Sequence, residues 1–421
     1  MRTANLAVLI SSLAPLVLAA QQPYDVHKII DAFRRPHEDL TILCAHRGLR
    51  WNGTADNSYD AYYRASEAGL ECIETDIRVS SDGYLPMIHD SGLGRETNVG
   101  EVEGQAAYNP FTGQGHNPKV EDSAYSGFIE DLHLRDEAGR VRGETVPTLP
   151  GMVQYIHDVG MNVVLQLDFK DEAGVEIAYW QLKNLTNAAG VPANEWCIYK
   201  LQANWYRTPE EFEALAWVQD AFASGIQLAY IPVYNSGDME EWDVLASMKA
   251  FAKTNYTISA EINMKSTDGP LRPLKDWVED EASDDAAFRT SGIFFAIGDF
   301  VDPITSPRTY FDTANYTLPD DIRTNNSAFS YQDGRAPRLY DAMVSEDESP
   351  DGHDYRTDFG WIIGNAFDWV IADATDELAA MLAMDGKRNV QHLLAKGEAA
   401  ADEQLALGWY KKARRRAREF Q

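Results

Sequence analysis

Short apolar runs alternate with helix-like stretches along most of this 421-residue chain, and this alternation restricts its fold more than any other feature. The runs that we interpret as strands cover residues 42–45, 70–79, 163–169, 196–201, 227–233, 257–262, 292–297 and 369–374, and residues 84–90 are a further extended segment. The stretches with helical character cover residues 57–69, 173–189, 208–223, 237–253 and 375–396. Such alternation indicates a parallel sheet covered by helices. About eight strands favour a single closed (β/α)8 barrel over an open doubly wound sheet. The first helix should have Asp56 or Asn57 as its N-cap and should end at Gly69.

Two segments interrupt the alternation. Residues 100–145 are rich in Gly, Pro and Asn, and residues 299–360 are acidic and contain proline. A barrel of ~250 residues that grows beyond 400 with insertions accommodates both segments. We therefore expect one barrel domain over residues 21–421, with the two segments as long loops at its mouth.

The chain is strongly acidic. It has 37 Lys and Arg against 66 Asp and Glu, a formal net charge of −29, and 44% hydrophobic residues. The hydrophobic content excludes a disordered acidic chain, since such chains lack the apolar residues for a core. The charge argues against nucleic acid as a partner, because phosphate backbones bind basic surfaces.

The first 20 residues have the pattern of a secretory signal peptide. Arg2 precedes an apolar stretch over residues 6–18, and the small residues Ala19 and Ala20 stand before polar Gln21. That stretch is shorter than the ~20 residues that span a membrane, and no later stretch is a candidate span. N-glycosylation sequons follow at Asn52, Asn184, Asn255, Asn315 and Asn325. We expect a secreted, N-glycosylated protein without stable membrane insertion.

The chain has three cysteines, Cys44, Cys72 and Cys197. A secreted protein of this size has a large enough core to fold without a disulfide framework. Cys44 and Cys72 lie inside apolar runs, so the default prediction is buried free thiols, with one disulfide as the alternative.

Carboxylates stand where the expected strands end, which is where a parallel barrel carries its functional groups. Glu74 and Asp76 are two residues apart in one strand, so both side chains face the same side of the sheet. Asp168, near the end of a later strand, is the natural third carboxylate. Crowded carboxylates require a neutralising cation, and hard oxygen ligands select Mg²⁺ or Ca²⁺. The sequence therefore predicts a site for one divalent cation.

Two histidines and two basic residues stand near these carboxylates in the expected fold. His46 follows the first strand and His89 ends a later extended segment, and two histidines that flank a cation can serve as general acid and general base. Arg47 and Lys170 can hold the two equatorial oxygens of a phosphodiester. For each residue alone, an ordinary structural role remains the alternative.

Several motifs, in this order, resemble the glycerophosphodiester phosphodiesterase family. They are AHRG at 45–48, DNSYDAYYRASEAG at 56–69, IETDIRVSSDGYLPMIHD at 73–90, LGRETNVG at 93–100, VPTL at 146–149, LDFK at 167–170 and VIADATDEL at 370–378. The resemblance is concentrated in residues 41–170. It implies a TIM barrel that cleaves a small phosphodiester to an alcohol and a phosphomonoester.

Carried over residue by residue, the resemblance implies one divalent cation bound by Glu74, Asp76 and Asp168. It implies His46 and His89 as the acid/base pair and Arg47 and Lys170 as phosphate contacts. The attacking group can be water or a neighbouring substrate hydroxyl, which would give a cyclic intermediate.

Two positions depart from the family pattern, and two other functions remain open. Asp56 and Asp168 stand where the family has glutamate, so each carboxylate is one methylene shorter. The alternatives are a barrel phospholipase similar to sphingomyelinase D, which forms a cyclic phosphate, and a barrel-derived binding protein without catalysis. The last alternative predicts that the strand-end carboxylates do not cluster. The sequence indicates neither the alcohol leaving group nor the oligomeric state.

Overall fold

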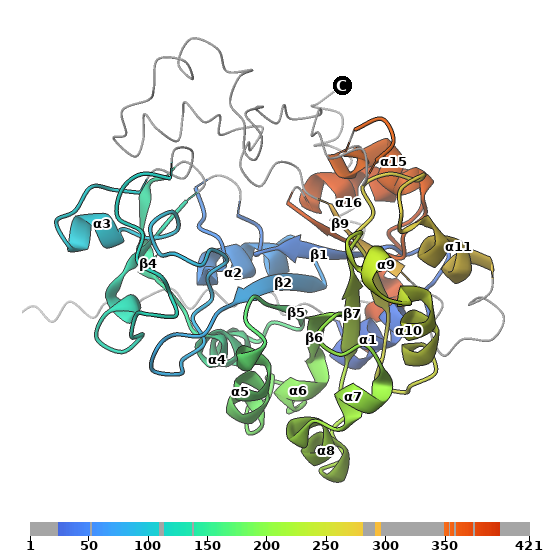
Figure 1. The fold of residues 1–421 in the computed structure, drawn as a ribbon, viewed down its shortest axis with the longest axis horizontal. Helices are drawn as coiled ribbons and strands as arrows, with labels where there is room; N and C mark the ends of the chain where they lie inside the picture. Colours follow the sequence, from blue (N-terminus) through green and yellow to red (C-terminus); the bar gives the residue numbers. More distant parts are fainter. Residues whose placement is uncertain are drawn as a thin grey trace, which may run out of the picture.

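Eight parallel strands close into a barrel in the order β1-β10-β9-β8-β7-β6-β5-β2 (Figure 1). The computed structural model describes residues 24–50, 53–108, 113–136, 139–280, 291–295, 349–352, 354–357, 359–373 and 375–395. The barrel strands are β1 (Ile42–His46), β2 (Cys72–Ile77), β5 (Val164–Phe169), β6 (Cys197–Gln202), β7 (Tyr230–Tyr234), β8 (Ala260–Ile262), β9 (Ser291–Phe295) and β10 (Trp369–Ala372). The expected (β/α)8 barrel is confirmed.

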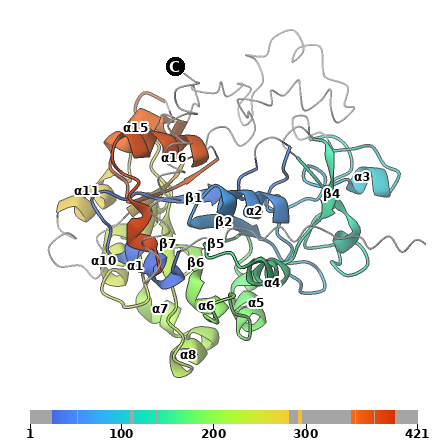
Figure 2. The same ribbon diagram turned by 180° about the vertical axis from the view of Figure 1, so that it is seen from behind.

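Helices surround the strands, and α4 to α8 lie on the outside of the barrel when it is seen from either side (Figures 1 and 2). The α-helices are α1 (Val26–Arg34), α2 (Tyr59–Glu67), α3 (Val99–Val102), α4 (Leu149–Val159), α5 (Ala173–Leu182), α6 (Ala193–Trp196), α7 (Pro209–Glu213), α8 (Ala216–Ala223), α9 (Asp238–Glu241), α10 (Val244–Phe251), α11 (Arg272–Asp280), α15 (Phe359–Gly364) and α16 (Thr375–Met384). The 3-10 turns are η1 (Ile129–Asp131), η3 (Tyr355–Thr357) and η4 (Val390–Leu393). None of the helices in these described ranges is long and apolar enough to cross a membrane.

The strands form where apolar runs are buried on both faces. Every residue of β1, β2 and β7 is buried. One face of each strand fills the barrel, and the other packs against helices, as in parallel sheets generally. The carboxyl ends of neighbouring strands therefore come to one end of the barrel, with Asp76 in register with Asp168 and Asp168 with Lys200.

Several local predictions need correction. The N-cap of α2 is Ser58, whose side chain accepts a hydrogen bond from Ala61 N, whereas Asn57 has a left-handed backbone with φ 52°. Residues 84–90, which we expected as an extended segment beyond the second strand, lie outside the barrel sheet, and Pro86 pairs there in an isolated bridge with Thr148. The last expected helix stops early, at Met384, where the chain turns at Gly386 with φ 79°.

Three other expected helices are also shorter than the predicted stretches. The helix expected over residues 173–189 ends at Leu182, and residues 208–223 divide into α7 and α8. Residues 237–253 divide into α9 and α10, because the Asp243 side chain caps a new helix by accepting from Ala246 N.

The expected insertion at 100–145 has a small core of its own. It contains an antiparallel pair of strands, β3 (His133–Arg135) and β4 (Val141–Thr145). A second apolar cluster, separate from the barrel core, lies beneath this pair and comprises Ala55, Ile88, Leu93, Val99, Val120, Ile129, Leu132, Leu134 and Val146. The segment is therefore more ordered than the long loop that we expected. Most of the other expected insertion, 299–360, lies outside the described residues, as does the expected signal peptide at 1–20.

Cys44 and Cys72 form a disulfide, and the default prediction of free thiols is wrong for this pair. The two residues are in register on the neighbouring parallel strands β1 and β2, so their side chains point to the same side. Both are fully buried. Cys197 is a buried free thiol, as predicted.

A buried ion pair closes the end of the barrel where the strands begin. Both Glu71 carboxylate oxygens contact the Arg388 guanidinium, at 2.7 and 2.8 Å, and Glu71 also accepts a hydrogen bond from Leu43 N. Arg388 donates in turn to the Thr41 carbonyl. These contacts connect the start of β1 and β2 to the segment after α16.

Candidate active site

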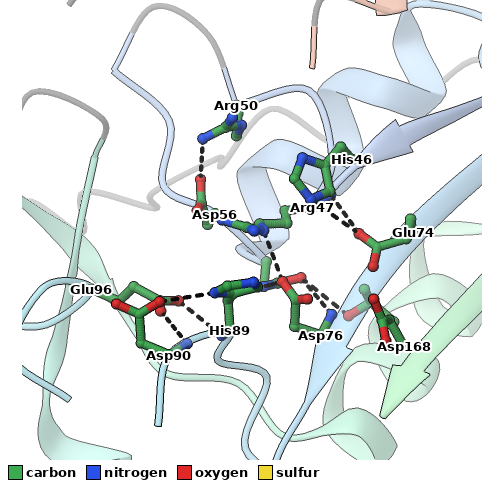
Figure 3. A network of polar contacts seen from close by, with 12 residues as sticks. His46, Arg47, Arg50, Asp56, Glu74, Asp76, His89, Asp90, Glu96 and Asp168 are labelled. Atoms are coloured by element: carbon green, nitrogen blue, oxygen red, sulfur yellow. Dashed lines mark hydrogen bonds and ion pairs between the residues drawn. The ribbon is translucent and has the colours of Figure 1, made fainter. Parts of the chain in front are cut away.

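The three predicted carboxylates meet where β2 and β5 end (Figure 3). One oxygen from each of Glu74, Asp76 and Asp168 lies within 4.8 Å of the other two. Glu74 and Asp76 are buried, and Asp168 is half-buried. Three hard oxygen donors at this spacing fit one divalent cation, because each ligand atom lies about 2.0–2.6 Å from Mg²⁺ or Ca²⁺. The departure at Asp168 does not remove it from the cluster.

Basic side chains also contact this triad. Lys170 Nζ lies 2.8 Å from Asp76 Oδ1 and 3.1 Å from Asp168 Oδ2. The Arg47 guanidinium is 1% exposed and pairs with Asp76 through Nε at 2.9 Å and with Asp56 through Nη1 at 3.0 Å. Both predicted phosphate contacts therefore lie beside the triad, where they offset carboxylate charge.

These charges shift the pKa values of the three carboxylates in different directions. Burial, together with the neighbouring Asp76, raises the pKa of Glu74 well above its usual range. Burial alone would also raise the pKa of Asp76, but Lys170 and Arg47 lower it well below its ordinary value. Burial of Asp168 is outweighed by Lys170 and Lys200, so its pKa falls to about 2. Asp76 and Asp168 are therefore ionised at neutral pH.

His46 and His89 lie on different sides of the triad, His46 beside Glu74 and His89 beside Asp76 (Figure 3). His46 Nδ1 is 2.6 Å from Asp373 Oδ1, and its Nε2 is 3.9 Å from Glu74 Oε2. His89 Nδ1 is 2.8 Å from Asp90 Oδ1. A carboxylate at Nδ1 holds that nitrogen protonated and leaves Nε2 to exchange a proton with a bound molecule.

Arginine side chains connect Asp373 and Asp90, the partners of the two histidines, to Asp56. Arg50 Nη2 lies 2.6 Å from Asp373 Oδ1, and Arg50 Nη1 lies 3.3 Å from Asp56 Oδ1. Arg95 pairs with Asp90 at 2.6 Å and with Asp56 at 3.8 Å. Burial alone would raise the pKa of Asp56, but the surrounding arginines lower it to about 2. Asp56 therefore holds together the loops that carry both histidines.

Contacts within residues 89–96 also fix the loop of His89. The buried Glu96 accepts hydrogen bonds from the backbone N–H groups of His89, at 3.2 Å, and Asp90, at 2.8 Å. His89, Asp90 and Glu96 have a spacing that a metal ion could use, but Arg95 already pairs with both carboxylates. We therefore interpret this cluster as structural support for His89.

Sequence reasoning missed several residues of this site. Lys200 Nζ lies 3.3 Å from Asp168, 3.8 Å from Glu74 and 3.4 Å from Glu261. From the sequence, we assigned no functional role to Lys200 or to Glu261. We also assigned no role to Asp373, which directly follows β10, or to Arg50, which follows β1. The available signal was their position, since each stands at or just after the carboxyl end of a barrel strand.

The segment with the predicted site residues also matches a known family. Residues 46–195 match the model of the glycerophosphoryl diester phosphodiesterase family. A glycerophosphodiester phosphodiesterase of Caldanaerobacter subterraneus is 29% identical over 136 residues, which are 30% of this chain and 45% of that protein. One of Bacillus altitudinis is 38% identical over 60 residues, which are 14% of this chain and 24% of that protein. Residues 46–195 of this chain are therefore similar to the glycerophosphodiester phosphodiesterase family.

A solved structure supports the barrel fold of this chain. The crystal structure of a glycerophosphoryl diester phosphodiesterase from Parabacteroides distasonis superposes with a TM-score of 0.50 at 14% identity. The superposition covers 90% of this chain and 95% of that one. The sequence matches to the two curated family members span less than half of each relative. All seven predicted site residues fall within the family match, whereas Lys200, Glu261 and Asp373 lie beyond it.

Proposed function

We propose that this protein is a secreted, metal-dependent phosphodiesterase that hydrolyses small glycerophosphodiesters to an alcohol and glycerol phosphate. The observation that carries the proposal is the carboxylate triad with one histidine on each side, each imidazole held by an aspartate. A non-catalytic binding protein would not need its strand-end carboxylates clustered in this way. The similarity of residues 46–195 to the glycerophosphoryl diester phosphodiesterase family supports the same reaction class.

The chain's own residues would divide the reaction as follows. Glu74, Asp76 and Asp168 would hold the cation, which supplies charge to stabilise the phosphoryl oxygens. One histidine takes the proton of the attacking water or neighbouring substrate hydroxyl as the new P–O bond forms, and the other protonates the departing alkoxide as the old P–O bond breaks. If the substrate hydroxyl attacks, the product is a cyclic phosphate, which a water molecule then opens to glycerol phosphate. Lys170 and Arg47 add positive charge beside the transferred group.

Glycerophosphocholine is the substrate for the first test. We expect hydrolysis to stop with a chelator and to return with Mg²⁺ or Ca²⁺. His46→Ala and His89→Ala should each reduce kcat by ~10²-fold or more, the usual contribution of a general acid or base. His27→Ala is the matched control, because His27 lies on α1 and pairs with Glu195, outside the candidate site. Full activity in either His46→Ala or His89→Ala would contradict the assigned roles.

The products decide between the proposed function and its alternative. Phosphorus NMR should show glycerol phosphate, and proton NMR should show free choline. Choline phosphate would show cleavage at the other ester bond, and a persistent cyclic phosphate would favour the reaction of the sphingomyelinase D type.

Secretion and glycosylation are part of the same proposal. A disulfide in the barrel is typical of an oxidising compartment. The sequon residues Asn184 and Asn255 are exposed, whereas Asn52, Asn315 and Asn325 lie outside the described residues. Protein purified from the medium should begin near Gln21 and should lose mass on enzymatic removal of N-glycans. An intact residue 1–20 segment in that protein would contradict the signal peptide.

A further inference from the structure

One buried ion pair in the barrel belongs only partly to the cation site. Lys200 on β6 and Glu261 on β8 are each 3% exposed. Their charged atoms are 3.4 Å apart across a strand, since β7 lies between β6 and β8 in the sheet. An internal lysine of this kind needs carboxylate partners, because a buried unpaired charge is very costly.

Lys200 has those partners on two sides. It contacts the ligand carboxylates of Asp168, at 3.3 Å, and Glu74, at 3.8 Å. It also contacts Glu261, which is not one of the three clustered ligands. The ammonium therefore connects the triad to a fourth carboxylate behind it.

The formal charge of the site follows from these contacts. The three ligands and Glu261 supply four carboxylates, and Arg47, Lys170 and Lys200 supply three cations that touch them. With all four carboxyl groups ionised, as they would be around a bound divalent cation, this set carries a net charge of about −1. One divalent cation makes it positive by one, and one phosphodiester monoanion then makes it neutral.

We propose that the Lys200–Glu261 pair sets the charge of this site and so balances its affinity for a divalent cation against its affinity for phosphate. Lys200 repels the cation and attracts the phosphate, and Glu261 does the reverse. Neither residue needs to touch the substrate, so both are positioning residues. The inference rests on the proposed function for the location of the cation site.

The two single variants should act in opposite directions. Lys200→Met should bind Ca²⁺ and Mg²⁺ about tenfold more tightly and inorganic phosphate more weakly, because like charges a few ångströms apart interact strongly in a buried site. Glu261→Gln should bind both cations about tenfold more weakly and phosphate more tightly. The double variant should return both affinities to within about threefold of the wild type, because the removed charges cancel.

Isothermal titration of the purified full chain measures these affinities directly. Ca²⁺ or Mg²⁺ is titrated first, and inorganic phosphate is then titrated at saturating Ca²⁺. Lys183→Met and Asp220→Asn form a matched control, because these residues make a partly exposed pair between α5 and α8. Neither control should change cation or phosphate affinity.

Opposite shifts are the result that a purely structural role would not produce. Weaker cation binding in both single variants, or a double variant worse than either, would overturn the proposal. If Lys200→Met does not fold, Glu261→Gln alone must still weaken cation binding and strengthen phosphate binding. Lys200→Arg keeps the charge and should leave cation affinity within about threefold. A wild-type protein that binds no divalent cation would instead contradict the metal dependence in the proposed function.

Discussion

The same local arrangement recurs at His46 and His89. In each case an aspartate oxygen lies within hydrogen-bond distance of Nδ1, at 2.6 Å for Asp373 and 2.8 Å for Asp90. Each aspartate is in turn held by an arginine, Arg50 or Arg95. The orientation of both imidazoles therefore depends on side chains that need not contact the substrate.

Asp373→Asn tests this dependence. The amide keeps the shape of the carboxylate but can present its NH₂ group to Nδ1, which would favour the wrong tautomer of His46. We expect kcat for glycerophosphocholine to fall at least about tenfold, with a smaller change in KM. Asp385→Asn, at an exposed position just after α16, is the control. A kcat unchanged by Asp373→Asn would mean that His46 does not need this carboxylate.

The low pKa of Asp56 leads to a separate prediction about the stability of the folded protein at acid pH. Its pKa is lowered from the ordinary 3.8 to about 2 in the folded protein. A group whose folded pKa is depressed stabilises the fold above its unfolded pKa and loses that contribution as the pH falls through the folded pKa. Asp56 should therefore contribute about 2 kcal/mol near neutral pH, and this contribution should decline between pH 4 and about pH 2.

Urea unfolding at pH 6 and at pH 3 measures this effect. Asp56→Asn should lower the free energy of unfolding at pH 6 and should show a smaller further loss at pH 3 than the wild type. Parallel losses in the two proteins between these pH values would show that Asp56 titrates normally.

At the scale of elements, the barrel and the carboxylate cluster of the candidate site were predictable from sequence. Glu74 and Asp76 are two residues apart in one strand, so the sequence predicts that both side chains face the same side. Asp168 lies near the end of the next barrel strand, β5, and is in register with Asp76. The contribution of β6, β8 and β10 could not be derived in the same way. Lys200 reaches the triad because β6 pairs with β5 in register, Glu261 contacts Lys200 across β7, and Asp373 contacts His46 from the neighbouring β10. The order of these strands in the sheet is not evident from local sequence patterns.

The same limit explains two local errors. The Cys44–Cys72 pairing depends on the register between β1 and β2, so a choice between thiols and a disulfide had to remain open. Asn57 had the composition of an N-cap, but its side chain donates to Asp76 Oδ2 at 3.1 Å instead. Its left-handed backbone aims it into the barrel, and Ser58 takes over the cap.

Glu71 tests how the elements are joined at the other end of the barrel. Glu71→Ala removes a buried partner of Arg388 and an acceptor for Leu43 N, which leaves an uncompensated buried charge. We expect the free energy of unfolding to fall by about 3–5 kcal/mol. Denaturant unfolding measures the loss.

A surface pair provides the comparison for Glu71. Asp268→Ala breaks the exposed pair with Arg272 and should cost less than about 1 kcal/mol. Because Glu71 lies at the end of the barrel away from the histidines, Glu71→Ala should keep the kcat of its folded fraction. A large fall in kcat without a loss of stability would contradict the structural role.

At the scale of the whole molecule, the net charge of −29 acts on substrates before they reach the site. A diester with a net negative charge approaches against this field, whereas zwitterionic glycerophosphocholine does not. Salt screens such long-range repulsion, with a Debye length of about 10 Å at 0.1 M. The field therefore favours zwitterionic diesters most strongly at low ionic strength.

Raising the ionic strength should separate the two substrate classes. We expect kcat/KM for an anionic diester such as glycerophosphoglycerol to rise severalfold between about 10 and 150 mM salt. The value for glycerophosphocholine should change little and serves as the control, measured at a fixed saturating concentration of the divalent cation. Equal salt responses would show that the charge does not select between substrates.

The disulfide also imposes an order on how this molecule must be made. Both sulfur-bearing residues are fully buried in the finished barrel, two positions before His46 and Glu74 on the same strands. An oxidant can reach the thiols only while β1 and β2 are still accessible, so oxidation has to precede closure of the barrel. If the barrel closes in a reducing cytosol, Cys44 and Cys72 would remain as buried thiols. Later exposure to air would not oxidise them to the disulfide. Production in an oxidising compartment is then a requirement for homogeneous material.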